Sequence, residues 1–401
     1  MKKRLMLLGG IRYLLPVIEA AHKLGYYVIT ADYIPDNIAH RFSDEYVNVS
    51  IIDKEAVLKV AREKKIDGIM SFGVDPGVIS AAYVQEQMGL PAFGPFESVV
   101  ILQNKDLFRA FLKKHHFNVP EAKGYKSIDE ALADRDRWEY PVIVKPTDSA
   151  GSKGVSIVSI PDELEFALKN ALSYSFSGHI IVEQFIEQEG CSSDCDCFSI
   201  DGVLSFVSFS AQRFDRNAPN PFTPAAYSWP STFTDAQQFY FKQEIQRLLS
   251  LLNLGTSIYN VETRIGKDGL PYIMECSPRG GGNRLAEMVR YITGVDLIEA
   301  SVSAAVGGAV GRIEQAAFEG SWAEIIVHSN HDGIFQGLDI SERWKDYLVE
   351  ADLWVKSGDM VTEFKGANDA FGTLVMRFND NSEVLQVLDT CHEWLKLQIE
   401  C

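Results

Sequence analysis

Short apolar runs alternate with amphipathic stretches over residues 1–100. Short runs rich in Val, Ile, Leu and Met are typical of buried strands, and apolar positions three and four apart are typical of helices. The expected strands cover residues 4–10, 27–33, 46–52 and 68–73, and the expected helices cover 13–24, 54–65 and 77–88. Because strand and helix units alternate, this part is predicted to form a parallel, doubly wound sheet.

Beyond residue 103 the pattern changes to β-hairpins joined by helices. Apolar runs flank polar, glycine-containing turns in the hairpins expected at residues 142–158, 196–214 and 257–279. Residues 104–140 are expected to be mostly helical. Further helices are expected at 161–172, 235–253, 285–306 and 382–397, and further strands at 179–187, 323–330 and 371–378.

These changes of pattern divide the chain into three parts. The glycine-rich stretch 307–311 marks the second boundary. The predicted class is α/β (α+β multidomain), with a Rossmann-like parallel α/β domain over residues 1–103. A second domain is expected over 104–307 and a small C-terminal α+β subdomain over 308–401.

Composition limits the classes of partner. The chain has 401 residues, 38 Lys and Arg and 55 Asp and Glu, and a formal net charge of −17. This excess repels polyanions, so nucleic acid and anionic membrane surfaces are not expected as partners. Arg12 and two glycines interrupt the apolar start, so no secretory leader is expected. With no apolar run near ~18 residues and only six cysteines, the expected location is the cytoplasm.

Two local patterns allow other kinds of site. Cys191, Cys195 and Cys197 lie close together and could bind a metal, but no second cysteine pair or histidine accompanies them. Asp32 ends an expected strand, as a ribose-binding acid of a dinucleotide site would. The first turn reads GGIRYL and lacks the G-x-G-x-x-G pattern. We therefore favour a scaffold role for residues 1–103 that helps to shape a substrate cleft.

The loop inside the first hairpin is a candidate phosphate-binding loop. The order Gly151-Ser152-Lys153-Gly154 is followed by an apolar strand, whereas a P-loop runs into a helix. A glycine-rich hairpin of this kind can offer backbone N–H groups to phosphates. Lys145 lies on the strand leading in, where its charge could reach a phosphate. An ordinary hairpin turn is the alternative.

Later carboxylates add to this picture. Glu183 lies near the end of an expected strand, in VEQF, where a carboxylate and exposed backbone could hold an adenine. Glu262 and Glu275 flank the turn of the third hairpin and are expected to lie side by side. Adjacent like charges favour a shared cation, and oxygen ligands suit Mg²⁺. Arg279 follows in RGGGNR and could grip a phosphate or carboxylate. Surface glutamates paired with basic residues are the alternative.

The order of these segments resembles the ATP-grasp superfamily of carboxylate–amine ligases, which includes carbamoyl-phosphate synthase, biotin carboxylase and D-alanine–D-alanine ligase. The matching stretches are LQNKDLFRAFL, PVIVKP, GSKGVSIV, VEQFIE and MECSPRGGGN, spread over most of the chain. The resemblance implies an ATP-grasp fold for residues 104–307, with a mobile glycine-rich lid over 145–158.

The resemblance also implies roles for individual positions. Lys105 and Lys145 would contact the ATP phosphates, and the lid residues Ser149, Gly151, Ser152, Lys153 and Gly154 would cover them. Glu183, Gln184, Phe185 and Ile186 would hold the adenine. Glu262 and Glu275 would bind one or two Mg²⁺ ions, with Mn²⁺ as an alternative, and Arg279 and Lys145 would act in catalysis. Ser277 stands where the family often has a metal-binding Asn, and Gly190 where it has a ribose-binding acid, which Glu189 or Glu187 could replace.

The implied reaction is phosphorylation of a substrate carboxylate by ATP, followed by attack of an amine on the acyl phosphate, with release of ADP and phosphate. Small-molecule acids and amines would be the partners, in a possible homodimer. Arg213 and Arg216 lie in the Pro- and aromatic-rich stretch 212–233 and are candidates for binding the acid. The alternatives are a carbamoyl-phosphate-synthase-like or carboxylase-like enzyme with another acceptor, and a non-catalytic nucleotide-binding module.

Overall fold

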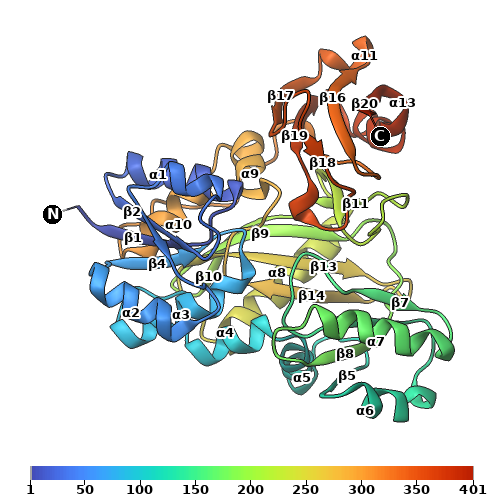
Figure 1. Cartoon of the computed structure of the whole chain (residues 1–401), viewed down its shortest axis with the longest axis horizontal. Helices are drawn as coiled ribbons and strands as arrows, with labels where there is room; N and C mark the ends of the chain where they lie inside the picture. The colour runs from blue at the N-terminus through green and yellow to red at the C-terminus, as the bar shows by residue number, and fades with distance from the viewer. Residues whose placement is uncertain (1, 401) are drawn as a thin grey trace.

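The structure is a computed structural model that describes residues 2–400, and it places three lobes around a central antiparallel sheet (Figure 1). The N-terminal lobe has a parallel sheet in the order β3-β2-β1-β4. Its strands are β1 Arg4–Leu8, β2 Tyr27–Asp32, β3 Glu45–Asn48 and β4 Gly68–Ser71, and its helices are α1 Leu15–Lys23, α2 Lys54–Lys64, α3 Val78–Met88 and α4 Phe96–Gln103. The predicted strand–helix alternation and the parallel sheet are confirmed here.

The second lobe carries the first predicted hairpin in an antiparallel sheet of order β5-β8-β6-β7. Its strands are β5 Ala122–Tyr125, β6 Val142–Pro146, β7 Ser156–Val158 and β8 Ile180–Gln184, and its helices are α5 Lys105–Lys114, α6 Ile128–Ala133 and α7 Leu164–Ser173. Residues 104–140 therefore contain a strand, β5, in addition to the expected helices. Its four residues pair with β8, and such a short edge strand has little sequence pattern of its own.

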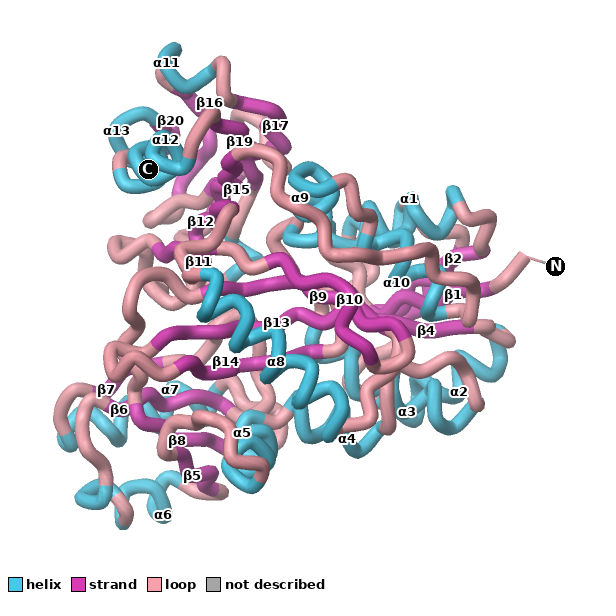
Figure 2. The backbone as a smooth tube through the Cα atoms, turned by 180° about the vertical axis from the view of Figure 1, so that it is seen from behind, coloured by secondary structure: helices cyan, strands magenta, loops and turns pink. Residues whose placement is uncertain are grey.

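The central sheet has the order β10-β9-β13-β14 and lies between the lobes, as the view from behind shows (Figure 2). Its strands are β9 Ser193–Ile200, β10 Val203–Ser208, β13 Ser257–Ile265 and β14 Pro271–Ser277. One face packs on α8 (Asp235–Leu251), whose apolar side chains share a core with Cys195, Cys197 and Val261. The stretch 285–306 forms two helices, α9 Leu285–Thr293 and α10 Leu297–Ala305, because Gly294 ends α9 with a φ of +75°.

The C-terminal lobe is built on a five-stranded antiparallel sheet of order β11-β12-β15-β19-β17 and a smaller sheet of order β18-β16-β20. The strands are β11 Ala211–Phe214, β12 Pro224–Trp229, β15 Ser321–Val327, β16 Gly333–Ile340, β17 Leu348–Leu353, β18 Met360–Val361, β19 Gly372–Phe378 and β20 Leu395–Glu400. Because β11 and β12 precede the predicted boundary at residue 307, this sheet joins strands from both sides of it. The three predicted domain ranges stay predictions.

The predicted final helix over residues 382–397 is wrong at its end. The chain forms α11 Glu342–Lys345, α12 Asn381–Asp389 and α13 Cys391–Trp394, and residues 395–400 then form β20. The side chains of β20 alternate between half-buried and exposed, as expected for a strand with one covered face. Pairing with β16 therefore overrides the apolar spacing that favoured a continuous helix.

Candidate active site

Glu262 and Glu275 face each other directly across β13 and β14. This confirms the predicted pairing, because opposed residues of an antiparallel pair project from the same face. Glu262 Oε1 lies 3.4 Å from Arg264 Nη2, and Glu275 Oε1 lies 3.3 Å from Lys105 Nζ. Burial, together with the charge of Glu275, raises the pKa of Glu262, although Arg264 opposes the shift. The pair is therefore a place where a cation would relieve electrostatic repulsion.

Two further acids extend this row, and the sequence analysis missed them. Asp194 on β9 is opposite Glu262, and Asp196 is opposite Asn260. The Asn260 amide donates to both, at 2.7 Å and 3.2 Å. Burial, with the charges of Glu262 and Asp196, raises the pKa of Asp194 to about 7, and burial raises that of Asp196 to about 6. The alternation Asp-Cys-Asp-Cys carried the signal, since it places the acids on one face and the cysteines on the other.

Lys105 connects the carboxylate pair to the glycine-rich loop. Its Nζ, which contacts Glu275, also donates to the Ser149 carbonyl oxygen at 2.9 Å. The loop itself relies on left-handed backbone at Gly151 and Gly154, with φ of +69° and +71°. A side chain at Gly154 would meet Tyr174 Cδ2 at 2.9 Å, so the loop packs tightly on its own lobe there. The loop is thus fixed next to the paired glutamates.

Lys145 and Glu183 form part of a buried ion cluster. Glu183 Oε2 lies 2.9 Å from Lys145 Nζ, and Oε1 lies 3.0 Å from Arg109 Nε. Glu183 is completely buried. Burial opposes ionisation, but Arg109 and Lys145 outweigh it and lower the pKa of Glu183 to about 2. The expected contact of this carboxylate with an adenine does not fit this geometry, because both oxygens face cations and none of the side chain is exposed.

The residues after Glu183 provide apolar surface. Ile186 is buried in a small cluster with Tyr272 and Met274. The Gln184 and Phe185 backbone N–H groups donate to Glu121 and Pro141 carbonyl oxygens, at 2.7 Å and 3.3 Å. Glu187 pairs with Lys267. Glu189 is exposed, and no ion pair of its carboxylate occurs within residues 2–400, so Glu189 is the freer of the two candidate ribose ligands.

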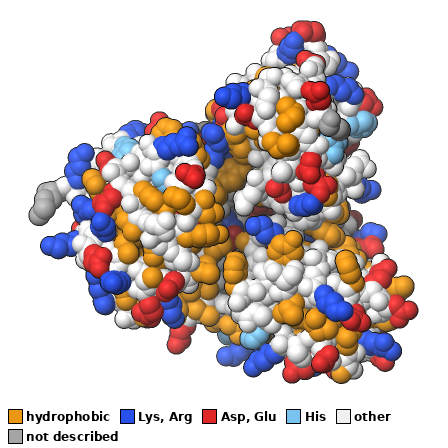
Figure 3. Space-filling view, viewed as in Figure 1, with side chains coloured by type: hydrophobic (Ala, Val, Ile, Leu, Met, Phe, Trp, Pro, Cys, Tyr) orange, Lys and Arg blue, Asp and Glu red, His pale blue; other side chains and the backbone are white. Residues whose placement is uncertain are grey.

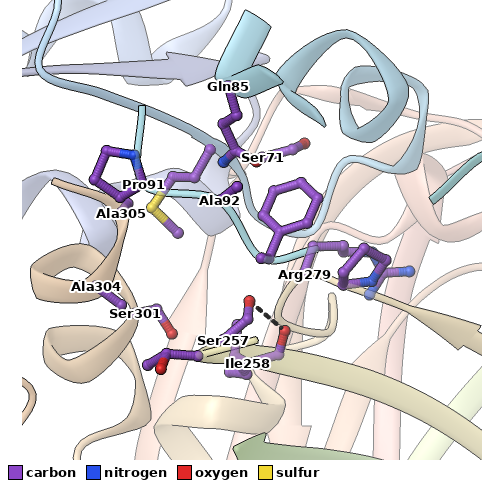
Figure 4. Close-up of a pocket in the computed structure, with 14 residues that line it drawn as sticks. Ser71, Gln85, Pro91, Ala92, Ser257, Ile258, Arg279, Ser301, Ala304 and Ala305 are labelled. Atoms are coloured by element: carbon purple, nitrogen blue, oxygen red, sulfur yellow. Dashed lines mark hydrogen bonds between the residues drawn. The ribbon is translucent and has the colours of Figure 1, made fainter. Parts of the chain in front are cut away.

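Arg279 is held by the N-terminal lobe. Its Nε and Nη2 donate to the two Asp75 carboxylate oxygens at 2.8 Å and 2.7 Å. Ser277 Oγ donates to Asp75 at 3.0 Å and accepts from Gln103 Nε2 at 2.8 Å. The guanidinium lies at the rim of a cavity of about 20 Å³, with room for about one water, between β4, α10 and β13 (Figure 4). Arg279 therefore already has a bidentate partner, which the sequence analysis did not foresee.

The segment that carries most of these residues matches a known protein family. The family described as "ATP-grasp domain" matches residues 138–287, which include the loop, Glu183 and the Glu262–Glu275 pair. This segment is therefore similar to ATP-grasp domains. A related sequence, the carbamoyl phosphate synthase large chain of Thermotoga petrophila, is 23% identical over 285 residues, or 71% of this chain and 25% of the relative. The chain thus spans about a quarter of the length of that relative.

Solved structures share the fold over the whole chain. The L-amino acid ligase from Bacillus licheniformis has a TM-score of 0.82 at 21% identity, covering 100% of this chain and 99% of that one. Phosphoribosylglycinamide synthetase from Anaerococcus prevotii has a TM-score of 0.76 at 21% identity, with both chains fully covered. The predicted fold class, with an ATP-grasp fold after the parallel α/β domain, is confirmed.

Further candidate residues lie in the C-terminal lobe and in the N-terminal lobe. Arg213 Nη1 lies 3.4 Å from Asp389 Oδ1 of α12, and Arg216 is exposed. Asp32 is occupied by its own loop, since it accepts from the Tyr33 N–H and the Asn37 amide, both at 2.6 Å. That geometry favours the scaffold interpretation of the N-terminal lobe. Binding of a substrate acid by the two arginines stays a prediction.

The cysteine hypothesis is not supported. Cys195 and Cys197 are buried on the α8 side of the central sheet, where their thiols donate to the Val261 and Tyr259 carbonyl oxygens. Among residues 2–400, no group of three or more His, Cys, Asp or Glu side chains is placed to hold a metal ion. Over the same residues, no helix is long and apolar enough to cross a membrane.

A cleft of about 500 Å³ separates the N-terminal and C-terminal lobes (Figure 3). Tyr13 and Leu15 line one side, and Arg284, Glu350 and Trp354 line the other. Next to it, Glu324 of β15 is completely buried, and neither carboxylate oxygen has a hydrogen-bond partner among the described residues. Burial raises the pKa of Glu324 well above its usual range, although Arg284 opposes the shift.

This buried carboxylate gives a pH prediction. The folded chain keeps a proton on Glu324 that the unfolded chain releases above its ordinary pKa of 4.5. Stability is therefore lost as pH rises from that value through the raised folded pKa. We expect Glu324→Gln to remove this loss, so its melting temperature should exceed that of the wild type by a margin larger near about pH 8 than near about pH 5. Thermal unfolding at both pH values, with the exposed Glu342→Gln as control, checks this. Parallel pH profiles would contradict it.

Proposed function

We propose that the chain is an ATP-dependent ligase that joins a carboxylate to an amine through an acyl phosphate and releases ADP and phosphate. One observation carries the proposal. The Lys105 Nζ contacts both Glu275, which is opposite Glu262, and the Ser149 carbonyl oxygen in the glycine-rich loop. The carboxylates suited to a metal and the loop suited to phosphates thus meet at one lysine, within a fold shared with carbon–nitrogen ligases.

The residues present fit a magnesium–nucleotide complex. Mg²⁺ is commonly held by one or two carboxylates together with substrate phosphates, and Glu262 and Glu275 would be those carboxylates. The same oxygens would accept Mn²⁺. Because the Ser277 hydroxyl is already bonded to Asp75 and Gln103, we favour one ion over two. When bound, the ion neutralises phosphate charge.

The side chains of this chain then divide the work. Lys105 and Lys145 would offset the charge of the phosphates as the terminal phosphoryl group moves to the substrate carboxylate. Glu183, together with Arg109, would position Lys145. For the Glu183 carboxylate, this role replaces the expected contact with the adenine. The backbone of residues 184–186, with the Ile186 cluster, would hold the adenine. Residues 145–158 would close as a lid, and Arg279 would stabilise the phosphorylated intermediate once released from Asp75.

Two other functions remain as alternatives. The curated relatives are named carbamoyl phosphate synthase large chains, and one similar structure is a biotin carboxylase domain solved as a dimer with MgADP and bicarbonate. That similarity favours a bicarbonate-dependent enzyme as the second candidate and is compatible with a homodimer. A non-catalytic module is disfavoured, because it would not need the Glu262–Glu275 pair. A cytoplasmic location stays a prediction.

A nucleotide product assay tests the proposal. We expect ADP and phosphate to form when panels of small carboxylic acids and amines are supplied together, and hydroxamates to form when hydroxylamine replaces the amine. ADP formation that requires only bicarbonate would favour the carboxylase-like alternative. Release of AMP and pyrophosphate would contradict the acyl-phosphate route. Absence of any ATP turnover with all panels would favour the non-catalytic module.

A further inference from the structure

The tip of the glycine-rich lid is bonded outside its own lobe. Ser152 Oγ donates to the Phe222 carbonyl oxygen at 2.9 Å, and the Ser152 carbonyl oxygen accepts from Asn220 Nδ2 at 3.2 Å. Asn220 and Phe222 belong to residues 215–223, the bridging segment, which links β11 to β12. Ser152 has a φ of +57°, an uncommon conformation for a residue other than glycine. Contacts with the bridging segment therefore fix a lid residue whose backbone conformation is unfavourable by itself.

The same Asn220 amide also holds a third segment. Its Nδ2 donates to the Lys365 carbonyl oxygen at 2.8 Å, and its backbone N–H donates to the Phe364 carbonyl oxygen at 3.4 Å. These residues belong to residues 362–371, the C-terminal loop between β18 and β19. Gly366 of this loop lies close to the lid, since a side chain there would meet the Gly151 carbonyl oxygen at 3.8 Å. One amide thus joins the lid, the bridging segment and the C-terminal lobe.

We propose that Asn220 is a latch, a positioning residue that holds the closed lid against the C-terminal lobe. Both of its amide protons are committed to carbonyl oxygens of segments far apart in the sequence, so one side chain couples the position of the lid to that of the C-terminal loop. The catalytic consequence rests on the function proposed above. A lid without its latch opens more often, admits water to the acyl phosphate, and separates ATP consumption from product formation.

A simpler role for Asn220 can be separated from the latch. Asn220 Oδ1 accepts from the Phe222 backbone N–H at 3.1 Å, which shapes the bridging segment by itself. Asn220→Asp keeps that acceptor but loses both amide donors. Asn217→Asp is the matched control, because it makes the same change in the same segment at an exposed side chain. The Asn217 backbone N–H, which donates to Asp215, is unchanged in this control.

Hydrogen exchange of the lid amides in the full-length protein is the test. Loss of the two hydrogen bonds should speed exchange at residues 151–154 about tenfold in Asn220→Asp, without nucleotide and with the non-hydrolysable analogue AMP-PNP and Mg²⁺. Asn217→Asp should match the wild type. Lid exchange in Asn220→Asp equal to that of the wild type in both states would overturn the latch.

Turnover separates this inference from the proposed function. In an active enzyme, Asn220→Asp should raise the ratio of ADP formed to product formed, while Asn217→Asp leaves it unchanged. An unchanged ratio would overturn the catalytic role of the latch. If lid exchange is faster in Asn220→Asp than in the wild type but the wild type never consumes ATP, the ligase function is refuted and the latch is still supported.

Discussion

Glu275→Gln should lower ATP-dependent turnover by roughly a thousandfold, or about 4 kcal/mol of transition-state stabilisation, without unfolding the protein. The amide keeps the size of the side chain but removes half of the charge that faces a metal ion across β13 and β14. The Glu275 side chain is 51% exposed, so the substitution creates no buried cavity. It also removes like-charge repulsion from Glu262, whose pKa should then fall toward its usual range.

Steady-state ADP release and thermal unfolding together check this prediction. Glu165→Gln is the matched control, because Glu165 is also a partly exposed glutamate paired with a lysine, Lys169. The control should keep its turnover. A Glu275→Gln variant with wild-type turnover would refute the assignment of the pair as metal ligands. A variant that loses both turnover and its folded state would instead show that the pair is structural.

Glu183→Gln should lower the free energy of unfolding by about 3–5 kcal/mol, because it leaves Arg109 and Lys145 without their buried carboxylate. Both cations are nearly inaccessible, with side chains 3% and 11% exposed. Urea unfolding of the variant measures the loss. Glu121→Gln is the control, since the Glu121–Arg137 pair is exposed and should contribute at most about 1 kcal/mol. A loss at Glu183 as small as that at Glu121 would contradict the ion-cluster account.

The same cluster sets a pH window. The folded pKa of Glu183, about 2, lies below the ordinary value of 4.5. The stability that this carboxylate contributes is therefore fully present above the ordinary value and is lost as pH falls through the folded value. Acid unfolding of Glu183→Gln should lack that part of the pH dependence, which gives the prediction a second readout.

The sequence predicted those features that depend on local pattern. Strand–helix alternation identified the parallel sheet of the N-terminal lobe, and the spacing of Glu262 and Glu275 around one turn predicted their pairing. The short strand β5 and the strand β20 were missed because their partners, β8 and β16, are distant in the sequence. Pairing between distant segments decides such elements, and local spacing does not report it.

Long-range contacts also explain what was missed in the site. Lys145 and Glu183 were identified, but Arg109 lies on α5, and only the fold shows that it shares Glu183 with Lys145. Arg279 was expected to be free for a substrate, whereas Asp75 from the N-terminal lobe occupies it. Asp194 and Asp196 were visible as alternating acids in a strand. Only the pairing of β9 with β13, which are distant in the sequence, shows that these acids lie beside Glu262.

In the proposed reaction, ATP phosphorylates a substrate carboxylate before the amine attacks. The product assay first identifies the substrate acid. The most direct test then supplies this acid with heavy oxygen in its carboxylate and measures the label in the released phosphate by mass spectrometry. We predict that each phosphate released carries one labelled oxygen from the acid and that ADP is the nucleotide product. Unlabelled phosphate, or label recovered in AMP, would contradict the account.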